Sequence, residues 1–211
     1  MSNIELCELL PIRAYEYHKI ITSTNDKIRD LINNSLIKEH NTKNTNKINN
    51  PKLPCLVVAR EQTAGRGRGN KCWWSGVGGL MMSFGLELGA DYFPINREVL
   101  PQFSPIVGEI VADVLKEYIP PQNIIEIRQP NDIYINNKKI GGILIESPTP
   151  NFAIIGIGIN INNSAQNAPI TINHKITTIF DLTGKKTDLR KILLELVAAF
   201  FDRICRSRYG R

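Results

Sequence analysis

The chain has 211 residues, of which 42% are hydrophobic, so it can bury the core of one compact domain. Its formal net charge of +6 favours an anionic partner, although the basic residues are spread along the chain. Its four cysteines form no CxxC pair and no apolar run reaches membrane-spanning length, which argues against a zinc site, a disulfide framework and a membrane span, and fits a reducing, cytoplasmic compartment.

The first half of the chain predicts three strands and one helix. The expected strands are a short one at 15–21, a buried one at 54–60 and one marked by alternation at 80–88. A helix capped by Ser23 or Thr24 should run to about residue 37. The stretch 39–51 is rich in Asn, Lys and Thr, and we interpret it as a flexible surface insertion.

The second half predicts more strands between helices. Helices are expected at 104–118 and from Asp188 onward, with a short helical turn at 177–182. The expected strands are 124–128, 133–136, 139–146 and 152–160. Asn136-Asn137 suits a hairpin turn. Paired strands before, between and after helices indicate an α+β fold, in which helices pack on one face of a mixed, largely antiparallel sheet.

The segment from Glu61 to Ser75 is the most informative stretch of the chain. Its three closely spaced glycines let backbone N–H groups approach a ligand. Its cations are Arg66, Arg68 and Lys71, and its aromatic residues are Trp73 and Trp74. Arginine forks match carboxylates and phosphates, and an aromatic face can cover an apolar group. The composition predicts a mobile loop that closes over a small, partly apolar anion; a solvated basic loop beside a core tryptophan is the alternative.

Three further segments combine turn residues or glycines with polar groups. Arg128-Gln-Pro-Asn-Asp-Ile133 places a turn at a strand entrance, which fits a ligand site or a plain Asx-turn. In Lys139-Ile-Gly-Gly-Ile-Leu-Ile-Glu146, a ligand lying across Gly141 and Gly142 would explain both glycines and bring Lys139 near a carboxylate or phosphate, whereas the alternative is an exposed lysine in a hairpin. Gly156-Ile-Gly-Ile-Asn160 lacks the third glycine of a dinucleotide site and fits a strand beside a ligand.

Residues for acid–base or nucleophilic catalysis are scarce. None of His18, His40 and His174 is placed with a serine or cysteine in a hydrolase motif. Arginines, lysines, glycines and one aspartate-bearing turn remain. Such a set suits charge stabilisation in a phosphoryl or nucleotidyl transfer.

Taken together and in this order, four motifs resemble those of biotin protein ligases, also called holocarboxylase synthetases, in the biotin/lipoate ligase superfamily. They are Ser23-Thr24-Asn25, the loop Gly65-Arg-Gly-Arg-Gly with Trp73, Pro130-Asn-Asp132 leading to Lys139-Ile-Gly-Gly-Ile-Leu144, and Gly156-Ile-Gly-Ile-Asn160. The resemblance implies a class II aminoacyl-tRNA synthetase-like fold and a single catalytic domain over 1–211. It also implies the two-step reaction of biotin–[acetyl-CoA-carboxylase] ligases. Biotin and ATP form biotinyl-5′-AMP, and a lysine of a biotin carboxyl-carrier domain then accepts the biotin.

The resemblance also assigns residues. Lys139, Arg66 and Arg68 are expected to be catalytic, because cations must screen the repulsion between the biotin carboxylate and ATP. The residues expected to bind biotin are Ser23, Thr24, Asn25, Gln62, Arg66, Gly67, Arg68, Lys139, Gly141 and Gly142. Those expected to bind ATP or the adenylate are Lys71, Trp73, Arg128, Asn131, Asp132, Gly156, Gly158 and Asn160. Mg²⁺ is expected to bind together with ATP and to have no dedicated protein site. If a protein group contacts the ion, we expect it to be Asp132.

Two departures from the family pattern stand out. The family usually has Lys-Trp before Pro-Asn-Asp, where this chain has Arg128-Gln129. Members normally carry a small domain after the catalytic one; here we expect neither that domain nor an N-terminal DNA-binding domain. The expected partners are a carboxylase carrier domain, biotin and ATP. A second copy of the chain, forming a homodimer, is a further possible partner. We expect no nucleic-acid partner and no membrane partner.

Three other functions remain open. A lipoate or octanoate protein ligase would share the fold and the activated-acyl chemistry, although the Gly-Arg-Gly-Arg-Gly loop disfavours it. A non-catalytic biotin- or nucleotide-binding remnant would follow from loss of the C-terminal domain. A nucleic-acid binder is disfavoured because the basic residues are dispersed and RNA-stacking motifs are lacking.

Overall fold

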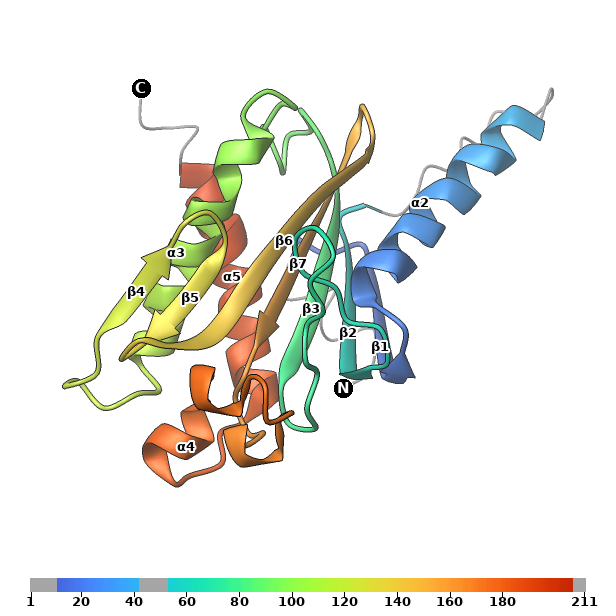
Figure 1. Ribbon diagram of the computed structural model, residues 1–211. Helices are drawn as coiled ribbons and strands as arrows, with labels where there is room; N and C mark the ends of the chain where they lie inside the picture. Colours follow the sequence, from blue (N-terminus) through green and yellow to red (C-terminus); the bar gives the residue numbers. More distant parts are fainter. Residues whose placement is uncertain (1–10, 42–52, 207–211) are drawn as a thin grey trace.

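The centre of the fold is a seven-stranded sheet with the strand order β1-β2-β3-β7-β6-β5-β4 (Figure 1). This computed structural model describes residues 11–41 and 53–206. Only β1 and β2 pair in parallel, and every other neighbouring pair is antiparallel. The strands are β1 Ala14–Ile21, β2 Cys55–Gln62, β3 Leu80–Glu87, β4 Ile125–Arg128, β5 Asp132–Ile135, β6 Lys138–Thr149 and β7 Phe152–Ile159. The predicted mixed, largely antiparallel sheet is confirmed, and each strand lies within a few residues of its expected range.

Helices cover both faces of the sheet, so the expectation that they pack on one face is wrong (Figure 1). The α-helices are α2 Thr24–Asn41, α3 Phe103–Lys116, α4 Ile179–Thr183 and α5 Leu189–Arg206, and the short 3₁₀ helices are η1 Leu100–Gln102, η2 Ala165–Asn167 and η3 Asn173–Lys175. The physical reason lies in the central strands, which are apolar on both sides. Leu56 of β2 belongs to the core beneath α3 and α5, whereas its neighbour Val57 packs under α2.

Aromatic rings fix the larger core. Phe84 of β3 stacks on Phe200 of α5 with ring centroids 4.4 Å apart. Phe103, at the start of α3, packs edge-on against the same Phe200. These contacts seat α3 and α5 together on one face of the sheet and leave the other face to α2.

Two local expectations have different outcomes. Asn136 and Asn137 have φ angles of 49° and 65° between β5 and β6, which confirms the hairpin turn. The insertion was expected at 39–51, but α2 continues through Asn41, because Lys, Glu and His tolerate a helix and no Gly or Pro stands between Thr24 and Pro51. Residues 42–51 of that expectation lie outside the described residues. In the described ranges, every helix is too short or too polar to cross a lipid bilayer.

Candidate active site

A cleft opens on the α2 face of the sheet, where α2 begins and where β6 and β7 carry glycines. On β7, Gly156 and Gly158 share a face with Ile154, which packs under α2. Because neither glycine has a side chain, this face of β7 leaves room for other groups next to Ile154. The predicted residues that line the cleft are Ser23, Thr24, Asn25, Gln62, Arg66, Gly67, Trp73, Asn131, Lys139, Gly142, Gly156 and Gly158.

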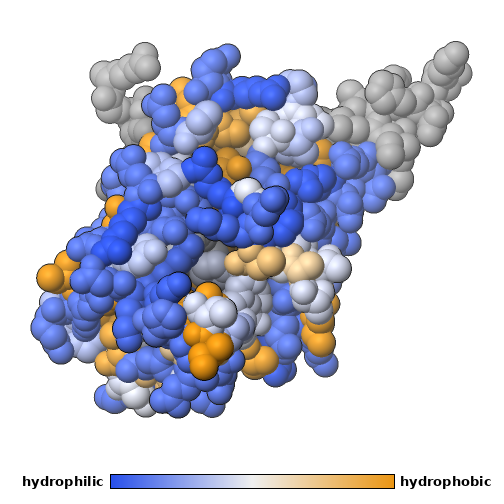
Figure 2. Space-filling view, in the orientation of Figure 1, coloured by the Kyte–Doolittle hydropathy of each residue, from blue (hydrophilic) through white to orange (hydrophobic). Residues whose placement is uncertain are grey.

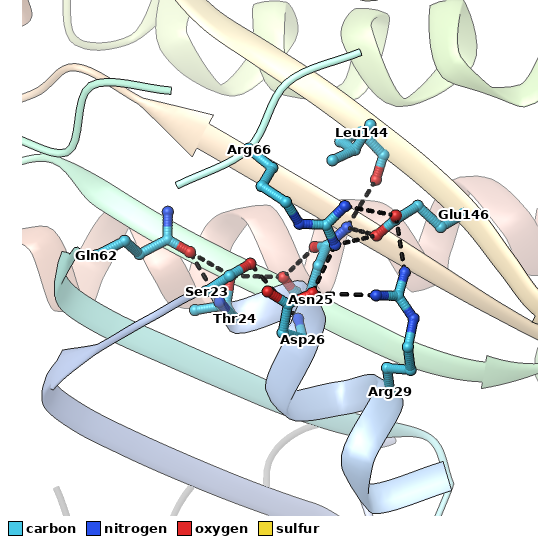
Figure 3. Close-up of polar contacts among 10 residues, drawn as sticks. Ser23, Thr24, Asn25, Asp26, Arg29, Gln62, Arg66, Leu144 and Glu146 are labelled. Atoms are coloured by element: carbon cyan, nitrogen blue, oxygen red, sulfur yellow. Dashed lines mark hydrogen bonds and ion pairs between the residues drawn. The ribbon is translucent and has the colours of Figure 1, made fainter. Parts of the chain in front are cut away.

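A buried polar network forms one end of the cleft (Figure 3). The backbone N and the hydroxyl of Thr24 both donate to Gln62 Oε1, at 2.8 and 3.1 Å. The Ser83 hydroxyl lies 2.6 Å from both Thr24 Oγ1 and Asn25 Oδ1. Ser23, Thr24, Asn25 and Ser83 are all buried. These hydroxyl and amide groups can donate and accept, so this end of the cleft suits a neutral polar group.

The glycine-rich loop is a small hairpin folded back over the cleft. Gly67 N donates to Lys71 O at 2.7 Å, and Trp73 N donates to Gly65 O at 2.8 Å. Gly69 at the tip has φ +62°, which favours glycine. The backbone of the loop is therefore held by its own hydrogen bonds.

Arg66 extends from this loop into a cluster of charged groups on α2 and β6 (Figure 3). Its terminal nitrogens donate to Glu146 at 2.9 and 3.0 Å and to Asp26 at 2.7 Å. Arg29 donates to Glu146 at 2.8 Å, and Asn25 Nδ2 donates to the same carboxylate at 2.7 Å. Burial alone would raise the pKa of Glu146, but the hydrogen bonds from Arg66 and Asn25 and the charges of Arg66 and Arg29 hold it below its ordinary value.

The Trp73 indole lies close to glycines of two strands. A Cβ atom at Gly158 would stand 2.6 Å from the Trp73 indole, and one at Gly142 would stand 3.3 Å from it. Lys139 Nζ lies 5.6 Å from the ring centroid and 2.7 Å from Asp132 Oδ1. With the indole in this place the free space of the cleft is about 50 Å³, room for a few water molecules.

Two donors in the cleft are left without a partner. Arg66 Nε and Trp73 Nε1 are both buried, and neither has a hydrogen-bond partner among the described residues. An unpaired buried donor is costly, and its cost is relieved when a ligand supplies an acceptor. Both residues line the cleft, so they point to a ligand with oxygen acceptors there.

Several predicted cations lie outside the cleft. Arg68 is exposed and lines a neighbouring cavity of about 320 Å³ with Arg97 and Ser104. Lys71 is exposed near the loop tip. Arg128 is exposed, donates to Glu126 at 2.8 Å and stacks over a tyrosine ring. The cavity beside Arg68 adjoins the cleft, since Asn131 and Ile143 line both.

Four other predicted residues have mainly structural contacts. Gly141 is buried, and a Cβ there would face Ile133 of the core. Asn160 is buried and accepts a hydrogen bond from Asn163 at 2.9 Å. Asn131 borders the cleft but donates its side-chain amide to Ile143 O at 2.9 Å. Asp132 pairs with Lys139 and so orients that lysine.

Sequence reasoning missed two carboxylates and one hydroxyl of the site. Glu146, Asp26 and Ser83 were not assigned, although each contacts a residue that was. Alternation along β6 offered a signal for Glu146, because Gly142, Leu144 and Glu146 lie on one face of that strand. Hydrophilic residues cover most of the face shown in Figure 2, so surface character alone does not mark these groups.

The sequence of the chain is similar to those of known proteins. The sequence model of the biotin/lipoate A/B protein ligase family matches residues 21–162, more than half of the chain. A bifunctional ligase/repressor BirA from Bacillus subtilis is 33% identical over 192 residues, which cover 89% of this chain and 52% of that protein. The chain thus spans about half the length of this relative.

Solved structures match over most of the chain. A biotin protein ligase from Aquifex aeolicus in complex with biotin and ATP has a TM-score of 0.67 and 29% identity, covering 91% of this chain and 70% of that one. A biotin protein ligase from Leishmania major in complex with biotinyl-5-AMP has a TM-score of 0.66 and 26% identity, covering 91% and 75%. The fold expected from the resemblance is confirmed.

Proposed function

Since the chain belongs to the biotin/lipoate A/B protein ligase family, we propose that it is a biotin protein ligase. It would activate biotin with ATP and transfer it to a lysine of a biotin carboxyl-carrier domain, as a biotin–[acetyl-CoA-carboxylase] ligase does. One observation carries the choice of biotin: the cleft has a buried polar end built from Thr24, Gln62 and Ser83.

The polar end fits the ureido ring of biotin better than it fits an alkyl or dithiolane group. A cyclic urea offers one carbonyl acceptor and two N–H donors, which hydroxyl and amide side chains can match. An octanoyl or lipoyl group would bring only apolar atoms to Ser23, Thr24 and Gln62 and leave polar groups without new partners. Ser23, Thr24, Asn25 and Gln62 are therefore proposed to hold the ureido ring.

The first step needs positive charge where the valeryl carboxylate meets ATP. The carboxylate oxygen attacks the α-phosphorus, a new P–O bond forms, and pyrophosphate leaves with its bonding electrons. Lys139 is proposed to supply this charge. Supporting this, the residue lines the cleft, and its ammonium group gives only one of its three N–H bonds to Asp132. Arg68, in the adjoining cavity, would face the phosphates. The remaining nucleotide contacts proposed here are Trp73, Asn131, Gly156 and Gly158, which line the cleft. Lys71, Arg128 and Asn160, which were also expected to bind ATP, do not line it.

Mg²⁺ would balance part of the triphosphate charge. The described residues contain no group of three or more His, Cys, Asp or Glu able to hold a metal. A magnesium ion would then take most of its ligands from phosphate and water, as Mg²⁺ usually does in nucleotide sites. Asp132 is the carboxylate beside Lys139 and is the proposed protein contact of that ion.

The second step transfers the acyl group. The amine of the acceptor lysine attacks the acyl carbon of biotinyl-5′-AMP, a C–N bond forms, and AMP leaves. The adenylate hydrolyses if water reaches it, so a cover is useful. We propose the hairpin of the glycine-rich loop and Trp73 as that cover, because Arg66, Gly67 and Trp73 line the cleft. Because Trp73 fills much of the cleft, we expect the indole to shift when biotin enters.

The test is a direct assay of both half-reactions. The chain is mixed with MgATP and either biotin or lipoate, and pyrophosphate release is followed; a carrier domain is then added and probed with streptavidin. We expect biotin-dependent pyrophosphate release and a labelled carrier. The assay uses a reducing buffer, like the cytoplasm, and contains no nucleic acid or membrane, because the proposed reaction needs neither. Release with lipoate but not biotin would replace the proposal with a lipoate ligase, and biotin binding without any release would leave a binding module. Size exclusion of the same sample would test the homodimer.

A further inference from the structure

The Glu146 carboxylate is the meeting point of three segments of the chain. It stands on β6, two residues beyond Leu144 on the cleft face. Arg66 reaches it from the glycine-rich loop, and Asn25 and Arg29 reach it from α2. Figure 3 shows these side chains converging on the one carboxylate. It is the only acidic group drawn there on β6.

The bonds to Glu146 are stronger than those of an ordinary surface ion pair. The Glu146 side chain is 19% exposed, against 36% for Arg66. Each Glu146 oxygen accepts from Arg66, at 2.9 and 3.0 Å, so the contact is a two-point fork. Such forks fix orientation as well as distance. A network of charges also contributes more to stability than an isolated exposed ion pair does.

Asp26 completes the hold on Arg66. Its Oδ1 accepts from Arg66 at 2.7 Å and from Arg29 at 3.1 Å. Both terminal nitrogens of Arg66 therefore have carboxylate partners, and the guanidinium plane is fixed. The Nε atom remains buried at the cleft without a partner among the described residues.

We propose that Glu146, assisted by Asp26, is a positioning residue that fastens the glycine-rich loop over the cleft through Arg66 and presents the Arg66 Nε–H to the bound acyl substrate. The hold joins the loop to β6 and to α2, which begins with Thr24 and Asn25 of the polar end. The part that concerns the acyl substrate rests on the proposed function. The fastening of the loop is a statement about the protein without any ligand.

Trypsin measures the fastening directly, because the loop contains three of its cleavage points, Arg66, Arg68 and Lys71. Glu146→Gln keeps the shape of the side chain and removes its charge. We expect the ligand-free variant to be cut in this loop at least about tenfold faster than wild type, with fragments identified by mass, since one charge-assisted fork is lost. Asp26→Asn should act in the same direction with a smaller effect.

Kinetics supply the second readout. In biotin-dependent pyrophosphate release, Glu146→Gln should raise the KM for biotin about tenfold and change kcat less, because chemistry at Lys139 is untouched. The matched control is Glu109→Gln, which removes a carboxylate from the exposed Glu109–Arg203 pair between α3 and α5 and should match wild type in both assays. Circular dichroism verifies that each variant is folded.

The outcomes separate the two proposals. If wild type releases pyrophosphate with biotin but Glu146→Gln equals Glu109→Gln in loop cleavage and in KM, the positioning role is wrong and the ligase assignment stands. If no variant uses biotin but Glu146→Gln still exposes the loop to trypsin, the fastening stands and the ligase assignment fails. Faster cleavage with an unchanged KM would overturn the presentation of Nε to the substrate.

Discussion

Lys139 is the residue on which the proposed chemistry depends most. Its ammonium group lies 2.7 Å from Asp132 and over the Trp73 ring, so its position is fixed before any ligand arrives. Preorganised charge of this kind acts on the charge that develops in the transition state.

Lys139→Ala should slow biotinyl-adenylate formation by about 10²–10³-fold, the usual cost of losing one preorganised donor. Pyrophosphate release at saturating biotin and ATP measures it. Lys138→Ala is the matched control, because Lys138 is the exposed neighbour on the same strand and should retain wild-type rates. Equal rates for the two variants would remove Lys139 from the mechanism.

For single residues, the sequence predicted which residues belong to the site better than it predicted where their side chains point. Lys139 and Gln62 could be predicted because motifs fix their place in the chain, and both line the cleft. The motif did not reveal that Arg66 is paired with two carboxylates while Lys71 is exposed. The direction of Arg66 depends on Glu146, which lies 80 residues from it in sequence.

Among the elements, β7 shows how a strand can hold a site by lacking side chains. Gly156 and Gly158 face α2 and the cleft, and a Cβ at Gly156 would stand 2.2 Å from Asn25 Oδ1. The two glycines let Asn25 and Trp73 lie against the sheet. Strand interiors disfavour glycine unless such a close approach is needed.

Gly158→Ala should expel the Trp73 indole from the sheet, because the new Cβ would meet it at 2.6 Å. We expect redder tryptophan fluorescence and a loss of about 1 kcal/mol in the free energy of unfolding. A Trp73→Ala background removes the clash, so Gly158→Ala should cost much less stability there. Equal costs in both backgrounds would show that the indole does not need Gly158.

Alternation predicted the strands well but not what covers them. In β3 the pattern placed Leu80, Met82 and Phe84 on one face and left Met81 and Ser83 for the other. Both sets are buried, the second beneath α2 and the cleft. Periodicity separates two faces, yet it does not state that both will be covered, because that depends on where distant helices dock.

On the scale of the whole molecule, the site exists because β3 and β6 both pair with β7. These pairings bring the polar network of α2 and β3 next to the glycines and Lys139 of β6. Strand order follows from long-range packing. The motifs and the fold class could therefore be predicted from the sequence, but the spatial neighbours of each motif could not. The carboxylates that pair with Arg66 are such neighbours.

The charged cluster should also make global stability depend on pH. The folded state holds the pKa of Glu146 below its ordinary value of 4.5, so the unfolded chain binds that proton more tightly. The stabilisation by Glu146 is therefore fully present above that ordinary value and is lost as pH falls through the lowered folded pKa. Urea unfolding of wild type and Glu146→Gln, from neutral pH to well below the ordinary carboxyl pKa, measures this. Wild type should be the more stable at neutral pH, and the gap should close in acid. A gap that stays constant over the whole range would mean that the charge of Glu146 contributes nothing to the hold on Arg66.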